Sequence, residues 1–333
     1  MSPSQGAIAR RYSAGGPSIA AFVAIPLIIA LLAAGLVSAE SPLGVTRVSP
    51  ADAERAGSAI HLLRRVVGGA TLVRVKGPAT GMSLLAVSAD GNQVAIADQV
   101  GEAFGSLTLA ETNGSQLRIP MAGLLAASFA ADGSWLSVID GRGAVWRVDG
   151  ASGRASLLAD GPFIGSPIIE GDGSLLMLAV PSVEAPYESH FVRLGAATGS
   201  VTRLSEQELV YGAFQLDGGE LAIVAHAPEG TSVRRLTSTG EQLLVDLGLD
   251  AVNVAVARNG RVAFERNGEV LVIDAPGSAA RSITVGSRPC FGPDGSSLLV
   301  RRGNQTLALD TSGSELAVSD EPAGFAASAG CLP

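Results

Sequence analysis

The chain has 333 residues, of which 47% are hydrophobic and only 16% are charged, and its formal net charge is −8. Soluble proteins carry about 25% charged residues, so this composition favours many buried strands, a membrane segment, or both. Lys76 is the single lysine, and the arginines form no basic stripe. These features argue against nucleic-acid binding, which depends on a positive surface.

The N-terminal segment has the pattern of an export signal. The pair Arg10–Arg11 precedes an uncharged apolar stretch of 21 residues, Ile19 to Ala39, and is expected to stay cytoplasmic. The small residues of the final VSA suit a signal peptidase, whereas the length of the stretch suits an inner-membrane anchor. We therefore expect residues 1–39 to be a signal peptide or a signal anchor, and residues 40–333 to be a single domain exported to the periplasm or beyond.

Six turns of the form Asp-Gly or Asn-Gly recur at a spacing of about forty residues in the exported part. Each turn lies between two short apolar runs, which is a strong hairpin signal and predicts a type I′ turn. Successive turns are separated by 42, 40, 45, 42 and 35 residues. Their first residues are Asp90, Asp132, Asp172, Asp217, Asn259 and Asp294.

A second glycine turn follows each first turn after about twenty residues. Two hairpins in each period of about forty residues mean four strands per repeat, which is the pattern of a β-propeller blade. The chain is thus predicted to be an all-β propeller. The second turns are centred on Gly114, Gly153, Gly199, Gly240, Gly277 and Gly313.

The length of the exported part predicts the number of blades. Its 294 residues divide into seven blades of 42, which matches the turn spacing. Because only six blades contain a first turn, we expect a split closing blade. Its inner strand would come from the tail, residues 323–331, and its other three strands from about 43–76. Such closure removes free sheet edges and holds the two ends together.

A helical interpretation competes for part of the N-terminal region. Ser49–Pro50 followed by acidic residues resembles a helix start, and the apolar residues between positions 56 and 67 have helical spacing. In this alternative the ring has six blades, and residues 50–67 form an N-terminal helix.

The segments VSADGNQVAIA and FGPDGSSLLV resemble the WD40-like repeats of bacterial exported propellers, the TolB-type family. These repeats place Ser-Pro-Asp-Gly between two apolar strands, and the chain has Pro293–Asp294–Gly295 preceded by Gly292 instead of serine. The resemblance covers most of residues 43–333. It implies a protein-interaction or scaffold role in the cell envelope.

The sequence lacks the motifs of common enzyme classes. It has no Gly-x-Ser-x-Gly elbow, no Walker A sequence and no His-Glu-x-x-His motif. The histidines, His61, His190 and His226, lack metal-ligand spacing, and the regular recurrence of the Asp-Gly pairs indicates turn geometry. We therefore predict no catalytic residue, no metal and no cofactor. The alternative is a lactonase-like or glycan-acting hydrolase or lyase with a site in the central channel.

Recognition is expected on the loops between the second and third strands of the blades, opposite the Asp-Gly turns. The longest such loop, Val180 to His190, belongs to the third blade. Long loops with exposed aromatic residues on a rigid scaffold are common recognition sites. The expected partner is an envelope protein or peptide, with membrane contact only through an uncleaved N-terminal segment. The partner-binding candidates are Glu184, Tyr187, Glu188, His190, Glu102 and Phe104.

The two cysteines, Cys290 and Cys331, both lie in the exported part. An even count in an oxidising compartment predicts one disulfide, with two unrelated thiols as the alternative. The bridge would attach the closing strand to the blade before it.

The sequence as a whole predicts an exported, non-catalytic propeller that binds a protein or ligand in the bacterial envelope.

Overall fold

The structure is a computed structural model. The chain divides into two units, Met1–Glu40 and Ser41–Pro333, and the first lies outside the described residues together with the predicted export segment. Among the described residues, no helix combines the length and the apolar character that a membrane span requires. The described residues are 46–48, 58–66, 69–77, 83–98, 106–121, 123–183, 188–207, 209–292, 294–319 and 323–325.

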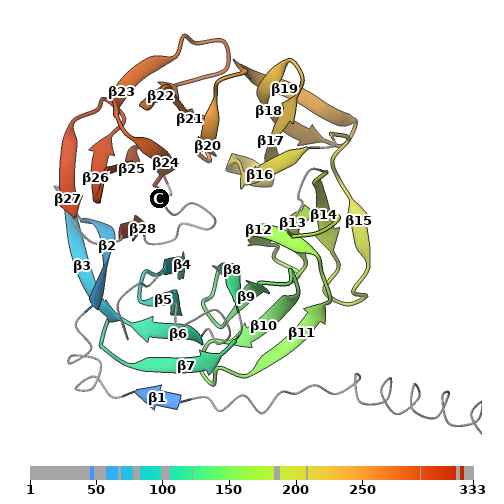
Figure 1. Ribbon diagram of the computed structural model, residues 1–333, viewed down its shortest axis with the longest axis vertical. Helices are drawn as coiled ribbons and strands as arrows, with labels where there is room; N and C mark the ends of the chain where they lie inside the picture. Colours follow the sequence, from blue (N-terminus) through green and yellow to red (C-terminus); the bar gives the residue numbers. More distant parts are fainter. Residues whose placement is uncertain are drawn as a thin grey trace, which may run out of the picture. The chain divides into compact units, whose positions relative to one another are not determined.

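The described residues form an all-β propeller with six four-stranded blades and no α-helix (Figure 1). In every blade, neighbouring strands follow one another in the chain. Blades 1 and 2 consist of β4 (Ser83–Val87), β5 (Gln93–Asp98), β6 (Ser106–Glu111), β7 (Gln116–Pro120), β8 (Leu124–Phe129), β9 (Trp135–Asp140), β10 (Val145–Asp149) and β11 (Ala155–Ala159). Blades 3 and 4 consist of β12 (Phe163–Ile169), β13 (Leu175–Ala179), β14 (His190–Leu194), β15 (Val201–Arg203), β16 (Val210–Gln215), β17 (Leu221–Ala227), β18 (Gly230–Thr237) and β19 (Gly240–Gly248). Blades 5 and 6 consist of β20 (Val252–Val256), β21 (Val262–Arg266), β22 (Glu269–Ile273), β23 (Arg281–Val285), β24 (Ser287–Phe291), β25 (Ser297–Arg302), β26 (Gln305–Asp310) and β27 (Glu315–Ser319).

The core lies between the blades. Successive side chains of a strand point to opposite faces of its sheet, so a blade can pack against both of its neighbours. Five clusters of buried apolar side chains each join two consecutive blades, from blades 1 and 2 through blades 5 and 6. Phe191 and Phe264 are among the largest fully buried side chains. Because each such side chain contributes about 1.5–3 kcal/mol, burial between sheets is the main force that holds the blades together.

The predicted Asp-Gly and Asn-Gly turns join the first and second strands of the blades. At Asp90–Gly91 the glycine N–H donates to the Ser88 carbonyl over 2.8 Å, and the glycine has a φ of 66°. The predicted type I′ geometry is wrong, because it needs a positive φ at two successive residues and Asp90 does not have one. The connection is instead a four-residue turn that ends on a left-handed glycine, as in hairpins built around a type I turn.

A three-stranded sheet contains both ends of the described chain. Its order is β28 (Ala323–Phe325), β2 (Ser58–Val66) and β3 (Gly69–Gly77). β2 and β3 form an antiparallel hairpin, and β28 pairs with β2 in parallel, with Ala323 opposite His61. The tail therefore does supply a strand to a sheet made by the N-terminal region. The helical alternative is wrong for residues 58–66, which form β2.

The second strand that was expected in this sheet lies elsewhere. β1 (Thr46–Val48) pairs antiparallel with β7 and extends the sheet of blade 1 to five strands. The prediction of a four-stranded closing blade is therefore wrong for the described residues. When a meander loses its second strand, the first and third strands become neighbours and run in the same direction, because strand direction alternates along a meander. The parallel pairing of β28 with β2 has this geometry.

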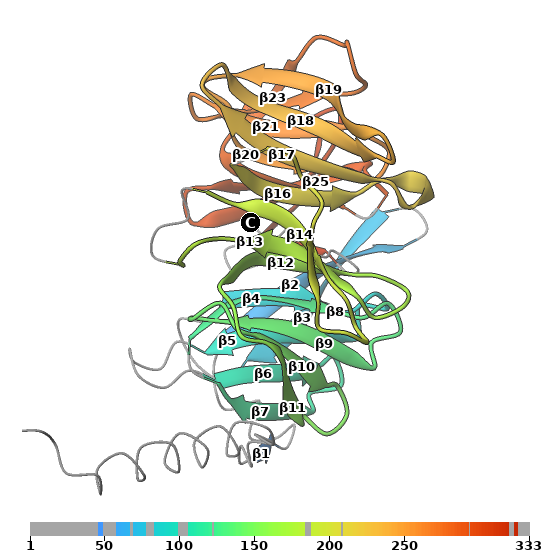
Figure 2. The same ribbon diagram turned by 90° about the vertical axis from the view of Figure 1, so that its right-hand side faces the viewer.

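The sheets follow one another around a closed ring (Figures 1 and 2). The inner strands β4, β8, β12, β16, β20 and β24 contact one another in chain order. The three-stranded sheet fills the remaining interval, because β3 contacts β27 of the sixth blade and β28 contacts β4 of the first. The sheet made from both ends of the chain thus closes the ring.

Cys290 lies in the inner strand β24, where it is buried and disulfide-bonded. The other cysteine of the sequence, Cys331, lies outside the described residues. The pairing of these two cysteines therefore stays a prediction.

Deleting residues 322–333 removes β28 and Cys331, whereas Cys290→Ser removes only the disulfide. A disulfide contributes about 2–4 kcal/mol, and each ladder hydrogen bond of β28 contributes about 1 kcal/mol net. We expect the deletion to lower the free energy of unfolding by about 2–3 kcal/mol more than Cys290→Ser does. Urea denaturation measures both, and equal losses would contradict a closing role for β28.

Candidate functional site

Each blade has two ends, which form two opposite faces of the ring. The turn face carries the Asp-Gly and Asn-Gly turns between the first and second strands. The bulge face, at the opposite end, carries the first residues of the six inner strands and the loops between second and third strands. In blade 3, for example, Phe163 at the start of β12 pairs with Ala179 at the end of β13, which pairs with His190 at the start of β14.

Carboxylates of the turn face are engaged within their own turns. Asp90 Oδ1 accepts hydrogen bonds from the Ser88 hydroxyl at 2.6 Å and from the Asn92 N–H at 3.0 Å. Asp132 and Asp172 each accept the N–H of the serine two residues further on, at 3.0 and 2.8 Å. These hydrogen bonds, led by the Ser88 hydroxyl for Asp90 and by the serine N–H for the other two, lower the pKa of all three carboxyls. The interpretation of these residues as turn formers is confirmed.

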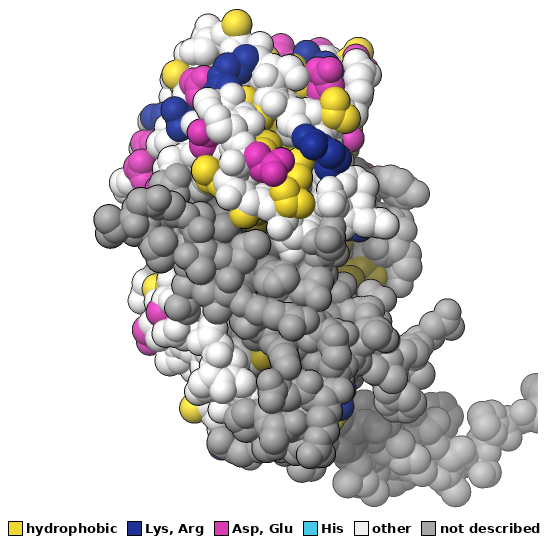
Figure 3. All heavy atoms as spheres, turned by 90° about the vertical axis from the view of Figure 1, so that its left-hand side faces the viewer, with side chains coloured by type: hydrophobic (Ala, Val, Ile, Leu, Met, Phe, Trp, Pro, Cys, Tyr) yellow, Lys and Arg dark blue, Asp and Glu magenta, His cyan; other side chains and the backbone are white. Residues whose placement is uncertain are grey.

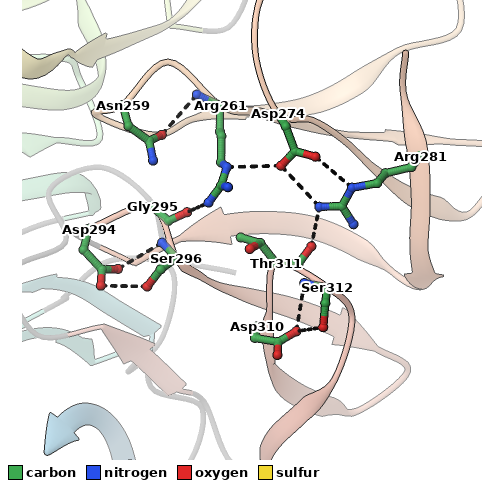
Figure 4. Close-up of polar contacts among 10 residues, drawn as sticks. All are labelled: Asn259, Arg261, Asp274, Arg281, Asp294, Gly295, Ser296, Asp310, Thr311 and Ser312. Carbon is green, nitrogen blue, oxygen red and sulfur yellow. Dashed lines mark hydrogen bonds and ion pairs between the residues drawn. The ribbon is translucent and has the colours of Figure 1, made fainter. Parts of the chain in front are cut away.

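On the turn face, Asp274 holds two arginines of blade 5 that each contact blade 6 (Figure 4). Its carboxylate lies 2.9 Å from Arg281 Nε and 3.1 Å from Arg261 Nε. Arg261 also donates to the Gly295 carbonyl of blade 6 over 3.1 Å, and Arg281 donates to the Thr311 carbonyl of the same blade. The hydrogen bond from Arg281 is the main cause that lowers the pKa of Asp274. This acid therefore acts as a structural link between two blades.

Every inner strand of the six four-stranded blades is irregular near its start on the bulge face. In each, the register to the second strand shifts once. Bulges occur often beside functional sites, because they re-aim a side chain. Their repetition at one end of the inner strands identifies the bulge face as the candidate binding surface. The shifts lie between Leu84 and Ala86, Leu124 and Ala126, Ile164 and Ile168, Val210 and Gly212, Val252 and Ala255, and Ser287 and Cys290.

Several large apolar side chains are exposed at these bulges. Leu125 is 46% exposed, Tyr211 41% and Val252 49%, whereas Ala127 further along β8 and Ala255 further along β20 are buried. Val285 at the end of β23, two residues before β24 begins, is 64% exposed. The bulge face therefore offers apolar contact area at separate positions around the ring.

Tyr211 is held in place although its ring is exposed. Its hydroxyl donates to Thr231 Oγ1 over 3.0 Å, and Thr231 Oγ1 donates to the Ala251 carbonyl over 3.1 Å. His226 Nδ1 lies 3.2 Å from the same threonine oxygen. Partial burial raises the pKa of Tyr211. The buried Thr231 hydroxyl therefore fixes the position of the Tyr211 hydroxyl.

The inner strands offer a narrow range of chemical groups. β4, β8, β12, β16, β20 and β24 contain no Asp, Glu or His. Within the described residues, no group of three or more His, Cys, Asp or Glu is placed to hold a metal ion. Glu170, which follows β12, forms a bidentate contact with Arg193 at 2.6 and 2.7 Å. A molecule bound at the inner strands would meet apolar side chains, hydroxyls, amides and the guanidinium of Arg288.

The residues predicted from the sequence to bind a partner are placed only in part. Glu188 is exposed, and His190 begins β14, where its Nδ1 lies 3.2 Å from the Gln207 carbonyl oxygen. Because β14 begins on the bulge face, these two residues lie at the end of the blade that the sequence predicted, and their binding role stays a prediction. The other candidates, Glu102, Phe104, Glu184 and Tyr187, lie outside the described residues.

Sequence reasoning missed the bulges, because strand register is not visible in a hydrophobic pattern. Two signals were nevertheless present. Asn253 in VNVAV and Arg288 in SRPCF place a polar residue at the second position of an inner strand, and both have a left-handed φ, 49° and 50°. Polar residues at equivalent positions of two repeats are a usable sign of an irregular strand start.

The side of the ring that carries β26 and β27 has mixed surface charge. Figure 3 shows acidic and basic side chains interspersed over its coloured part, with small apolar patches between them. The outer strand β27 exposes Leu316 and Val318. This mixture is ordinary for a solvated protein surface and gives no reason to place the site there.

No family model and no curated protein matches the chain. Among solved structures it is similar to TolB from Acinetobacter baumannii, with a TM-score of 0.51, 15% identity, and 80% of this chain and 81% of that chain covered. The chain is a β-propeller structurally similar to TolB. The TolB-type resemblance is thus confirmed at the level of the fold.

Two oligogalacturonate lyase structures are similar to the same extent. The lyase from Vibrio parahaemolyticus has a TM-score of 0.55 at 11% identity, with 79% of this chain and 84% of that chain covered. An oligogalacturonate lyase in complex with manganese has a TM-score of 0.54 at 12% identity, with 81% and 84% covered. At these identities the likeness shows the propeller fold alone.

Asp274→Asn is expected to destabilise the protein more at neutral pH than in acid. Arg281 and Arg261 lower the pKa of Asp274 from its ordinary 3.8. The carboxylate therefore stabilises the fold above that unfolded value, and its contribution is lost as the pH falls through the lowered folded pKa. Because these side chains are 29–41% exposed, we expect a loss of about 1 kcal/mol at pH 7 and a smaller loss at about pH 3.

Urea denaturation at the two pH values measures this loss. The control is Glu315→Gln, which removes a carboxylate from the outer strand β27 and should have no effect at either pH. A loss in Asp274→Asn that does not depend on pH would show that the charge of Asp274 is not what joins the blades.

Proposed function

We propose that this chain is an exported, non-catalytic β-propeller that serves as a binding scaffold for a protein or ligand in the bacterial cell envelope. The observation that carries the proposal is the set of exposed apolar residues at the irregular starts of inner strands, Leu125, Tyr211 and Val252. The partner binds on the bulge face, and the loop residues Glu188 and His190 extend the contact outward.

The properties of Tyr211 support this assignment. Tyrosine is over-represented among the residues that dominate binding energy at interfaces. Its hydroxyl is already fixed by Thr231 over 3.0 Å, so little conformational entropy is lost when a partner covers the ring. The rigid frame of packed blades keeps the other exposed residues at constant positions relative to it.

The chemistry of the inner strands favours binding over catalysis. The fold itself is compatible with either role, since TolB and oligogalacturonate lyase are both similar to the chain. An enzyme that acts at the centre of the ring needs acids, bases or metal ligands there. The inner strands of the six four-stranded blades instead present apolar side chains, hydroxyls, amides and one guanidinium.

Two features support export. The arginine pair Arg10–Arg11 and the uncharged stretch 19–39 have the order of a signal peptide or signal anchor. The disulfide at Cys290 fits an oxidising compartment. If residues 19–39 are not cleaved, they also anchor the propeller in the inner membrane.

A photo-crosslinking amino acid in place of Tyr211 is expected to form an adduct with a partner in the envelope of the native host. The same amino acid in place of Ala197, which is exposed on the turn face, is the matched control and should form none. The Tyr211 adduct should disappear in Leu125→Asp and Val252→Asp backgrounds, because a charge buried in an apolar contact is costly. Adducts of similar yield from both positions would contradict a partner on the bulge face.

Alkaline phosphatase fused after Pro333 is expected to be active, because this reporter needs an oxidising compartment to form its disulfides. Deleting residues 19–39 should lower its activity at least about tenfold by keeping the fusion in the cytoplasm. Mass spectrometry of the exported fusion then distinguishes a chain that begins at Glu40 from an uncleaved anchor. Equal alkaline phosphatase activity with and without residues 19–39 would contradict the export proposal.

A further inference from the structure

Blades 5 and 6 begin with the same backbone irregularity. In both, the register between the first two strands skips two residues, Asn253–Val254 in blade 5 and Arg288–Pro289 in blade 6. The first skipped residue has nearly the same left-handed φ in each, 49° and 50°. Asn253 and Arg288 therefore occupy equivalent positions, and each blade is a reference for the other.

Arginine is a poor choice for this position. Asparagine visits the left-handed region readily, because its short polar side chain can bond locally, whereas most other L-residues are disfavoured there. Pro289 adds to the cost, since the residue before a proline prefers an extended backbone. The Arg288 side chain is exposed, so burial does not offset the cost. Backbone outliers of this kind concentrate at functional sites.

The strand next to each bulge carries opposite charge in the two blades. In blade 5, Asn253 Nδ2 donates to Glu265 Oε2 over 2.7 Å, and Glu265 lies opposite the residue before the bulge. In blade 6 the residue opposite the position before the bulge is Arg301, which is exposed. Two arginines thus stand where blade 5 has an amide–carboxylate contact. Within the described part of the chain, neither Arg288 nor Arg301 forms an ion pair.

The next arginine along the chain has a structural role instead. Arg302 Nε lies 3.3 Å from the Val285 carbonyl oxygen, and its Nη2 lies 2.5 Å from Thr284 Oγ1. Arg266, at the same position in blade 5, donates to the Leu247 carbonyl in a similar way. Both arginines hold the outer strand of the preceding blade. Arg301 Nε donates to the Gly303 carbonyl of its own hairpin turn over 3.3 Å. Arg302 therefore links two blades, whereas Arg288 and Arg301 have no such role within the described residues.

We propose that Arg288 and Arg301 form a carboxylate-binding site that receives an acidic side chain from a peptide segment of the partner protein. The inference rests on the proposed function and names the ligand chemistry at one sector of the bulge face. Guanidinium groups bind carboxylates through charge-assisted, often bidentate hydrogen bonds. A bound carboxylate supplies the acid that blade 5 provides from its own strand, and it removes the repulsion between two like charges.

Apolar surface beside the arginines favours a peptide. The exposed Val285 lies three residues before Arg288, and Val252 and Leu249 are exposed at the start of the neighbouring blade, whose inner strand β20 contacts β24. A segment that alternates acidic and apolar side chains satisfies both kinds of surface. A uronic-acid chain supplies carboxylates without apolar side chains, so it serves as the competing ligand in the test.

The test uses fluorescence anisotropy of a fluorescein-labelled peptide that alternates glutamate and leucine, with the whole 333-residue chain in detergent at low salt. Trigalacturonate is the second probe and is expected to bind more weakly than the peptide. Arg288→Asn places the residue of blade 5 in blade 6 and should weaken peptide binding at least about tenfold. The same variant should raise the thermal unfolding midpoint by a few degrees, because it relieves the left-handed arginine.

Arg258→Asn is the matched control, because it removes an exposed arginine from the turn face and should leave peptide binding unchanged. A lower unfolding midpoint in Arg288→Asn would mean that Arg288 only supports the fold, and it would overturn the proposal. Unchanged peptide affinity in that variant, preference for trigalacturonate, or binding of neither probe would overturn it as well. None of these results affects the Tyr211 crosslink, so failure of this site and failure of the proposed function are distinguishable.

Discussion

The parallel pairing of β28 with β2 is the contact on which the ring depends. The six four-stranded blades pack in sequence through apolar clusters, and each cluster joins only two neighbours. Such a series leaves one unpacked face at each end unless a further sheet covers both. The sheet β28–β2–β3 meets this need by contacting β27 on one side and β4 on the other. Because its strands come from both ends of the chain, ring closure joins segments that lie far apart in sequence, and the entropy lost in bringing them together must be recovered from packing.

The two faces of the closed ring differ in how regular their strands are and in how their polar groups are satisfied. On the turn face the chain satisfies its own polar groups, as the serine contacts of Asp90 and the arginine contacts of Asp274 show. On the bulge face the inner strands depart from regular pairing at their starts and expose Leu125, Tyr211 and Val252. A left-handed non-glycine residue costs about 1–2 kcal/mol. A closed ring with buried sheet interfaces can carry such costs at one end, because the strands are held along the rest of their length.

Local sequence patterns predicted the strands and turns better than they predicted which strands pair with one another. Asp90–Gly91 and its repeats identified the hairpins, because a glycine after a short polar residue is a local requirement of the turn. The type of turn was wrong, since the hydrogen bond from Gly91 to Ser88 depends on geometry that two residue names do not specify. The short strand β1 was assigned to the closing blade but pairs with β7, because three residues contain too little information to select one of several open edges. Glu188 and His190 lie at the end of the blades that the sequence predicted, and their binding role stays a prediction. The bulges were not visible, because they depend on strand register.

Repetition within the chain separates what the fold requires from what it does not. Arg266 and Arg302 make the same kind of backbone contact in two successive blades, so their common position follows from the architecture. Asn253 and Arg288 share a backbone conformation but not a side chain, and their neighbours Glu265 and Arg301 differ in charge. The amide–carboxylate contact of blade 5 shows that this bulge can be satisfied from within one sheet. Blade 6 has two arginines at these positions and therefore lacks such a contact. The arginines lie on the face where apolar side chains are also exposed. The left-handed backbone of Arg288 has a free-energy cost, and no amide–carboxylate contact like that of blade 5 offsets it. A bound partner would supply the missing contact, so folding alone explains these two arginines less well than the rest of the bulge face.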